Sequence, residues 1–94
     1  MTTTIDKKTL AAHVILTLHL AQRRGRAATV ETVADELGVR KTDVREVVSL
    51  LHREGHVDGQ RMRLTFTGFA LAISLRGCRL RDLRSAPEAS VRAA

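Results

Sequence analysis

Arginine side chains are the groups of this 94-residue chain best suited to bind a ligand. Lys and Arg number 16 against 10 Asp and Glu, a net charge of +6, and most of these cations are arginines, whose planar fork matches phosphate and guanine. Residues 60–94 hold seven cations against two acids (+5), whereas residues 1–59 hold nine against eight (+1). We therefore expect a polyanionic partner. With two Phe and no Trp or Tyr, the chain lacks the aromatic platforms that bind single strands, which leaves a duplex.

Polar side chains cluster between Gly38 and Gly55. They lie outside the apolar stripe of the helix that is expected there, on its exposed face. The Arg45 guanidinium can donate two hydrogen bonds to a guanine, and nearby hydroxyls can reach phosphates or base edges. The alternative is a solvated helix face of mixed charge, because Asp43, Glu46 and Glu54 lower the net charge of residues 40–54 to +1. The candidate DNA-binding residues of this segment are Arg40, Lys41, Thr42, Arg45 and Ser49.

Three further residues are candidates for contacts with phosphates. Arg61 and Arg63 alternate with apolar residues, so both should leave one face of a short strand and bind phosphates or a minor groove. Alternatively, these exposed arginines only discourage pairing of strand edges. Thr29 opens a helix whose free N–H groups can bind a phosphate, although capping alone also explains this threonine.

Short helices must position these residues. Apolar residues recur at helical spacing over residues 9–24, 29–37 and 41–54, and a glycine follows each stretch, as expected for helix ends. The last two helices, joined by a tight turn at Gly38, predict a helix-turn-helix.

The chain then changes from helical periodicity to alternation. Apolar residues alternate with polar ones as far as Phe66, and Asp58-Gly59 predicts a hairpin turn between strands at about 56–57 and 61–65. From Thr67 the sequence again favours a helix, apolar nearly all round.

One domain accommodates these elements. We expect a flexible arm over residues 1–8, a domain over 9–76 and a basic, partly disordered C-terminal extension over 77–94. The predicted fold is mainly α: a winged helix-turn-helix with a three-helix core, a two-stranded β wing and an additional C-terminal helix.

Four sequence blocks carry a resemblance to a known class of protein. Ala34-Asp35-Glu36-Leu37-Gly38-Val39 resembles the bacterial helix-turn-helix phrase that precedes the recognition helix, and Leu50-Leu51-His52-Arg53-Glu54-Gly55-His56-Val57 resembles the passage from that helix into the wing. Leu64-Thr65-Phe66-Thr67-Gly68 and Leu71-Ala72 are similar to the wing exit of MarR-, DtxR- and Rrf2-type regulators. The blocks span about residues 9–75 and select no single family. The resemblance implies a winged-helix transcription regulator.

Arg40 departs from this pattern. The position that opens the recognition helix is usually Ser or Thr in these regulators, so the cap of this helix is expected at Thr42 instead.

Other functional classes have little support in the sequence. The sequence shows no nucleophile–base pair and no Gly-rich phosphate loop, the motifs that would indicate an enzyme. The histidines lack the spacing and partners of metal ligands, so we expect solvated or partly packed rings, no metal and no cofactor. Cys78, between two arginines, could be a redox-sensing thiol but is more simply incidental. No membrane span or secretory signal is apparent, which favours a cytoplasmic protein.

We therefore expect a sequence-specific, double-stranded DNA-binding transcription regulator. Its recognition helix, about 41–54, would lie in the major groove, and the wing, 56–65, on the backbone. A homodimer is expected, because the first and last helices carry surplus apolar residues, namely Leu16, Leu20, Leu71 and Leu75.

Two alternatives remain open. A winged-helix adaptor would use the mixed-charge third helix to bind a protein partner. A non-specific architectural protein would bind DNA through charge alone.

Overall fold

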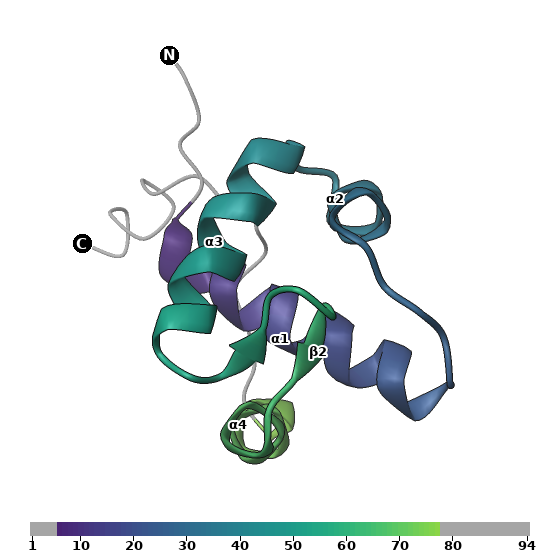
Figure 1. Ribbon diagram of the computed structural model, residues 1–94, viewed down its shortest axis with the longest axis vertical. Helices are drawn as coiled ribbons and strands as arrows, with labels where there is room; N and C mark the ends of the chain where they lie inside the picture. The colour runs from purple at the N-terminus through teal and green to yellow at the C-terminus, as the bar shows by residue number, and fades with distance from the viewer. Residues whose placement is uncertain (1–5, 78–94) are drawn as a thin grey trace, which may run out of the picture.

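The computed structural model describes residues 6–77 of the chain. Within them, four helices and a two-stranded antiparallel hairpin follow one another along the chain (Figure 1). The protein is thus mainly helical with a small sheet, as predicted. The elements are α1 (Lys7–Arg23), α2 (Val30–Leu37), α3 (Lys41–Arg53), β1 (Val57–Asp58), β2 (Arg63–Leu64) and α4 (Phe66–Arg76).

Helix α1 begins two residues before its predicted start. The Asp6 side chain accepts a hydrogen bond from the backbone N–H of Lys8 and another from the Thr9 hydroxyl, so it caps the helix at Lys7. This cap places Lys7 and Lys8 in the helix and not in the expected arm. Residues 1–5 of that arm, the C-terminal extension beyond Gly77 and Cys78 lie outside the described residues.

Helix α2 has the ends predicted for it. The backbone N–H of Thr32 donates to the Thr29 hydroxyl at 3.1 Å, and that of Thr29 donates to the Thr32 hydroxyl at 2.9 Å, a reciprocal cap that satisfies two free N–H groups. Gly38 closes the helix with φ of 69°, a left-handed conformation that costs glycine little.

Helix α3 begins without a side-chain cap. Arg40 is the capping residue and Lys41 the first helical one, so the expectation of a cap at Thr42 is wrong. The stripe predicted to face the core is buried, with Leu51 only 3% exposed.

The hairpin is shorter than predicted. Val57 pairs with Leu64, and Asp58 with Arg63. Met62 has φ of 53°, so the chain is still turning at this residue and the second strand begins only at Arg63. Arg61 therefore lies in the turn, and the prediction that Arg61 and Arg63 leave one face of a strand is wrong.

Helix α4 starts against the end of α3 through hydroxyl contacts. Thr65 caps the helix by accepting from the N–H of Gly68, and the hydroxyls of Thr65 and Thr67 both donate to the Gly55 carbonyl, at 2.6 and 2.7 Å. Phe66, which closes the apolar alternation and precedes the predicted helix start at Thr67, is the first residue of α4 and is 88% exposed. A Cβ on Gly68 would overlap the backbone carbonyl of His56, which explains why glycine occupies this position.

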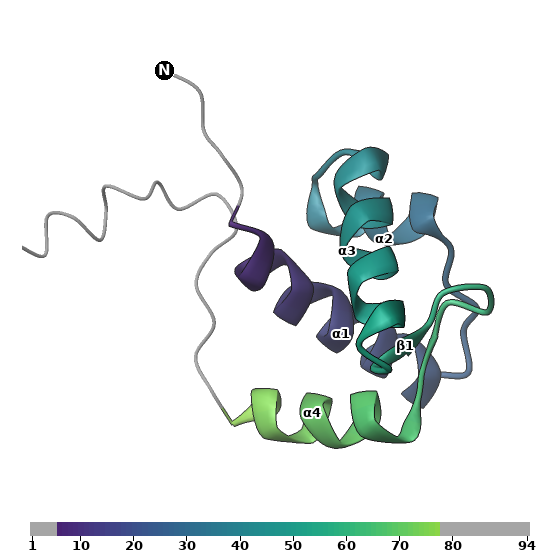
Figure 2. The same ribbon diagram turned by 60° about the vertical axis from the view of Figure 1, so that its left-hand side comes forward.

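Helix α1 is the centre of the molecule. It lies between α4 on one side and the α2–α3 pair on the other (Figure 2). Its buried residues Leu10, Val14 and Leu18 join the stripe of α3, Val57 and Ala72 in one hydrophobic core. No helix in the described part of the chain has the length and hydropathy that a bilayer crossing requires.

Candidate nucleic-acid interface

Three side chains form a line along the solvent face of α3. Arg45, Ser49 and Arg53 are spaced four residues apart, so they lie on one side of the helix, and all three are exposed. None of them makes a hydrogen bond or ion pair with a residue that the structure describes. Two guanidinium groups and one hydroxyl are thus available to a ligand along one helix face. We call these three residues the α3 stripe.

The carboxylates near this stripe are paired with cations. Arg40 contacts both oxygens of Asp43, at 3.3 and 3.4 Å. The same interaction leaves the Arg40 guanidinium less available to a ligand. Lys41 Nζ lies 3.8 Å from an oxygen of Glu31 on α2. The charges of Asp43 on α3 and of Glu31 on α2 are therefore compensated locally.

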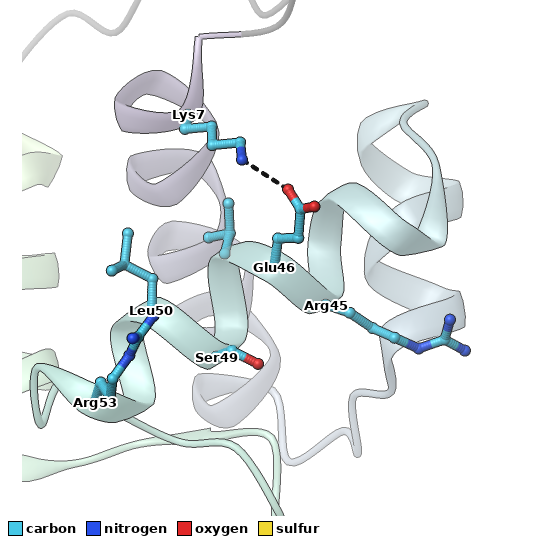
Figure 3. Close-up of a pocket in the computed structure, with 7 residues that line it drawn as sticks. Lys7, Arg45, Glu46, Ser49, Leu50 and Arg53 are labelled. Carbon is cyan, nitrogen blue, oxygen red and sulfur yellow. Dashed lines mark ion pairs between the residues drawn. The ribbon is translucent and has the colours of Figure 1, made fainter.

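Glu46 is paired across two helices. Its Oε1 atom lies 2.7 Å from Nζ of Lys7, the first residue of α1 (Figure 3). The hydrogen bond with Glu46, together with the charge of this carboxylate, raises the pKa of Lys7 above its usual value of 10.5. Figure 3 shows Arg45 pointing away from this pair, and its side chain is exposed.

Two open hollows flank the α3 stripe, which borders both. On the α1 side, a hollow of about 430 Å³ contains Lys7, Glu46 and Leu50. On the hairpin side, a hollow of about 440 Å³ has Val30 and Val48 among its lining residues. The other residues that line the second hollow are Arg45, Ser49, His52, Arg53, Gly59 and Gln60.

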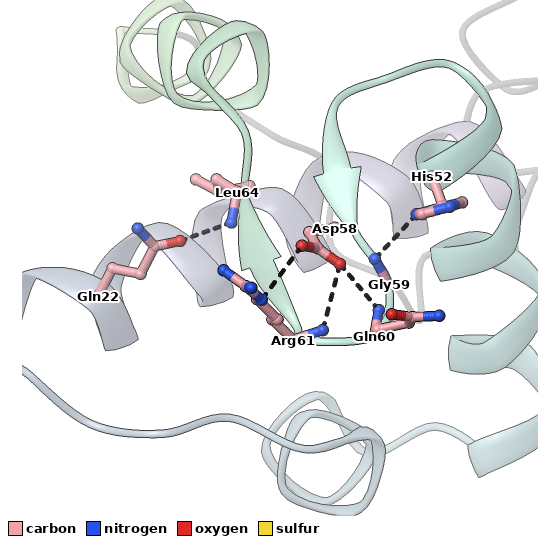
Figure 4. A network of polar contacts seen from close by, with 7 residues as sticks. All are labelled: Gln22, His52, Asp58, Gly59, Gln60, Arg61 and Leu64. Atoms are coloured by element: carbon pink, nitrogen blue, oxygen red, sulfur yellow. Dashed lines mark hydrogen bonds and ion pairs between the residues drawn. The ribbon is translucent and has the colours of Figure 1, made fainter.

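The turn of the hairpin is held by its own polar contacts (Figure 4). Asp58 Oδ1 accepts from the backbone N–H groups of Gln60 and Arg61. The ring Nδ1 of His52 accepts from the N–H of Gly59 at 3.0 Å, which joins the turn to α3. These contacts fix the backbone of the turn, and Gln60 lines the hollow beside the α3 stripe.

The second strand of the hairpin is attached to α1. Oε1 of Gln22 accepts from the backbone N–H of Leu64 at 2.6 Å, in a partly buried contact. Sheet and helix therefore hold a fixed relative position.

The predicted site residues fall into two groups. Arg40, Lys41, Thr42, Arg45 and Ser49 are all exposed at or along α3. Arg63 is exposed on β2, and Arg61 is exposed in the turn, where its Nε lies 3.8 Å from Asp58. Thr29 is exposed, with its hydroxyl engaged in the cap of α2. Neither hairpin arginine lines the two hollows beside α3, so the structure brings together the α3 residues but not the whole predicted set.

Three residues of this surface were not among the predicted ones. Arg53 continues the four-residue spacing of Arg45 and Ser49, so the helical period alone could have identified it. Gln60 follows from the turn geometry, and Lys7 from the packing of α1 against α3, neither of which the local sequence reveals.

His19 corrects the expectation of solvated or partly packed histidines. It is 4% exposed, its ring lies 5.1 Å from that of Phe69, and neither ring nitrogen has a hydrogen-bond partner among residues 6–77. Burial, and then the charges of Arg76 and Arg23, lower the pKa of His19 below its usual value of 6.5. No group of three or more potential metal ligands occurs within residues 6–77.

Comparison with known proteins adds no relative to this description. No family model, curated protein or solved structure matches the chain.

Proposed function

We propose that this protein is a winged helix-turn-helix regulator of transcription that binds double-stranded DNA in a sequence-specific manner. Helices α2 and α3, with the turn at Gly38, correspond to the helix-turn-helix, and β1 and β2 to the wing. In this arrangement α3 enters the major groove and the hairpin lies along the backbone. The resemblance of the sequence to bacterial winged-helix regulators supports the same assignment, and such a regulator would act in the cytoplasm.

The observation that carries the proposal is the α3 stripe. Its two arginines and its serine make no side-chain hydrogen bonds or ion pairs with other described residues, whereas Asp43 and Glu46 on the same helix are paired. An exposed line of donors on one helix face can follow the edge of a duplex groove and bind base edges as well as phosphates.

Each donor has a distinct role in this proposal. Arg45, in the N-terminal half of α3, reads a guanine through O6 and N7. Arg53 and Arg63 neutralise phosphates on either side of the groove, and Gln60 can hydrogen-bond to the backbone between them. Arg61 contributes less, because Asp58 offsets its charge.

We further propose that the protein acts as a homodimer through α4. Phe66, Phe69 and Ile73 are 88%, 42% and 49% exposed, and Leu20 of α1 is 39% exposed. An apolar surface of this kind is typical of an interface between subunits. The interface residues differ from those expected, because Leu16, Leu71 and Leu75 pack in part against the core.

A protein-binding adaptor is the second candidate. The observation in its favour is Leu50, which is 37% exposed on α3 and lines the hollow that contains Lys7. A protein partner could bury this side chain, whereas a duplex would gain less from it.

Titration with labelled duplexes tests the three candidates. A 20-base-pair duplex selected from a random pool and a scrambled duplex are titrated by fluorescence anisotropy at several salt concentrations. Tighter binding of the selected duplex supports the regulator. Equal binding of both with a steep salt dependence indicates the architectural protein, and absence of binding at low salt indicates the adaptor.

A further inference from the structure

We propose that Glu46 is a specificity-determining residue that accepts a hydrogen bond from cytosine N4, and that Lys7 is the positioning residue that makes this possible. The inference rests on the proposed DNA-binding function and extends it to a carboxylate on α3. An acidic side chain on such a surface ordinarily weakens DNA binding, since phosphates repel it. The cation beside Glu46 offsets this repulsion.

Lys7 neutralises Glu46 without covering it. The lysine contacts one carboxylate oxygen, Oε1, at 2.7 Å, and the side chain of Glu46 remains 58% exposed. In Figure 3 the dashed line from Lys7 ends on one of the two oxygens, and the other is turned away from the lysine. One oxygen is thus held in place while the other is open to a donor.

Asp43 shows that this arrangement is particular to Glu46. Both oxygens of Asp43 contact Arg40, and its side chain is only 20% exposed. Asp43 is therefore compensated but has little capacity left to accept from a base. On α3, Glu46 combines a compensated charge with an accessible acceptor.

The major groove offers few partners for such a group. A carboxylate can only accept hydrogen bonds, and the exocyclic amino groups of cytosine and adenine are the donors of the groove. Adenine N6 lies beside the acceptor N7, which repels a carboxylate, whereas cytosine N4 has no acceptor beside it on its own base. Cytosine is accordingly the base that Glu46 favours.

Arg45 and Glu46 are neighbours on α3 with opposite preferences. Arg45 supplies two donors for guanine, whereas Glu46 supplies one acceptor. The two side chains diverge by about 100° around the helix, so they face different base pairs. Together they would read two positions of one half-site.

The test uses base preferences and not affinity alone. The full-length wild type and its variants are incubated with a pool of 20-base-pair duplexes randomised at the centre, and the bound DNA is sequenced. Wild type should enrich cytosine at one position. In E46Q the enrichment should fall about tenfold, and adenine should replace cytosine there, because glutamine pairs with adenine N6 and N7. E36Q is the matched control, since it removes the same charge from α2, where Glu36 faces the hollow between α1 and α2.

The role of Lys7 is tested by a double-mutant cycle. In K7M the charge of Glu46 is no longer compensated and repels the phosphates, so binding to all duplexes should weaken about threefold. In the E46Q background the same substitution should have a much smaller effect. Additive effects would show that Lys7 contacts phosphate directly and would overturn its positioning role. Thermal unfolding of each variant confirms that the fold is retained.

The outcomes separate this inference from the function on which it rests. A wild type with clear base preferences that E46Q leaves unchanged, or changes only as E36Q does, overturns the role of Glu46 and leaves the regulator intact. A wild type that binds no duplex overturns both.

Discussion

His52 and Gly59 connect the helix and the hairpin that we propose to contact DNA. The ring Nδ1 of His52 accepts a hydrogen bond from the backbone N–H of Gly59 at 3.0 Å. A Cβ on Gly59 would lie only 3.4 Å from Val48 Cγ1 and 3.5 Å from the His52 ring, so the turn rests directly on α3. This contact helps to set the angle between Arg45 on α3 and Arg63 on β2.

Replacing His52 should loosen the turn without unfolding the protein. His52→Ala removes the acceptor for the Gly59 N–H, a loss of about 1 kcal/mol of unfolding free energy. The amide hydrogen of Gly59 should exchange faster in the variant, while amides in the middle of α1 keep their relative protection. Hydrogen exchange followed by NMR measures both. Unchanged protection at Gly59 would show that the hydrogen bond does not hold the turn.

Gly68 should be far less tolerant of substitution than its small size implies. An alanine Cβ there would overlap the carbonyl of His56, so the start of α4 must shift and disturb the cap formed by Thr65. Gly68→Ala should therefore lower the free energy of unfolding by about 1–3 kcal/mol, as measured by urea denaturation.

Gly77 provides the matched control for Gly68. It has φ of −85°, and of the described residues a Cβ at this position would meet only Ser74, at its carbonyl oxygen, 3.8 Å away. Gly77→Ala should change the stability by no more than about 0.5 kcal/mol. If the two variants were equally stable, the close approach of Gly68 to His56 would not constrain the fold.

Stability should decline in mild acid because of His19. The folded environment lowers the pKa of His19 below 6.5 through burial and the charges of Arg76 and Arg23. Above pH 6.5 the ring is neutral in both the folded and the unfolded chain. Below it, the unfolded chain binds a proton that the folded protein binds less readily, so the free energy of unfolding falls as the pH falls.

The variant His19→Leu isolates this contribution from those of the other histidines. It removes the titrating group and two buried nitrogens that have no hydrogen-bond partner in the described part of the chain, and leucine can still pack against Phe69. Unfolding midpoints in urea, measured from pH 7.5 to 5, should depend less on pH in the variant than in the wild type. Parallel curves for the two proteins would contradict the proposed role of His19.

The exposed face of α4 should control the oligomeric state. Ile73 is 49% exposed, so Ile73→Glu should leave the monomer folded but place a charge in the proposed dimer interface. Sedimentation velocity at micromolar protein should show a dimer for the wild type and a monomer for the variant. Leu50→Glu, on α3, is the control and should remain dimeric. A monomeric wild type would refute the dimer, whereas a monomeric L50E would locate the interface on α3.

Local signals predicted much of this architecture. Thr29 and Gly38 end α2 as expected, because a hydroxyl cap and a left-handed glycine act within a few residues. Leu51 is buried as its spacing predicts. The alternation of apolar residues failed at Phe66, because the cap formed by Thr65 ends the strand and starts α4 one residue earlier than predicted.

Contacts between distant segments could not be predicted in this way. The pairing of Lys7 with Glu46 depends on how α1 packs against α3. The position of Arg61 depends on the positive φ of Met62, a conformation that few non-glycine residues adopt. The residues that bear on charge and specificity were thus harder to predict than the helices that carry them.

The last prediction separates base reading from phosphate binding. Arg45 lies on the open face of α3 with no partner among the described residues, so Arg45→Ala should cost about 1–3 kcal/mol on the selected duplex and relax the preference at one base pair. The double variant Arg61→Ala/Arg63→Ala should instead weaken binding to selected and scrambled duplexes alike. Because Asp58 already offsets Arg61, the slope of log K against log salt should become shallower by about 0.9, the value for one phosphate contact and not two. Anisotropy titrations at four salt concentrations measure both quantities. If Arg45→Ala leaves the ratio of selected to scrambled affinity unchanged, α3 does not read the sequence, and the adaptor becomes the better explanation of its exposed face.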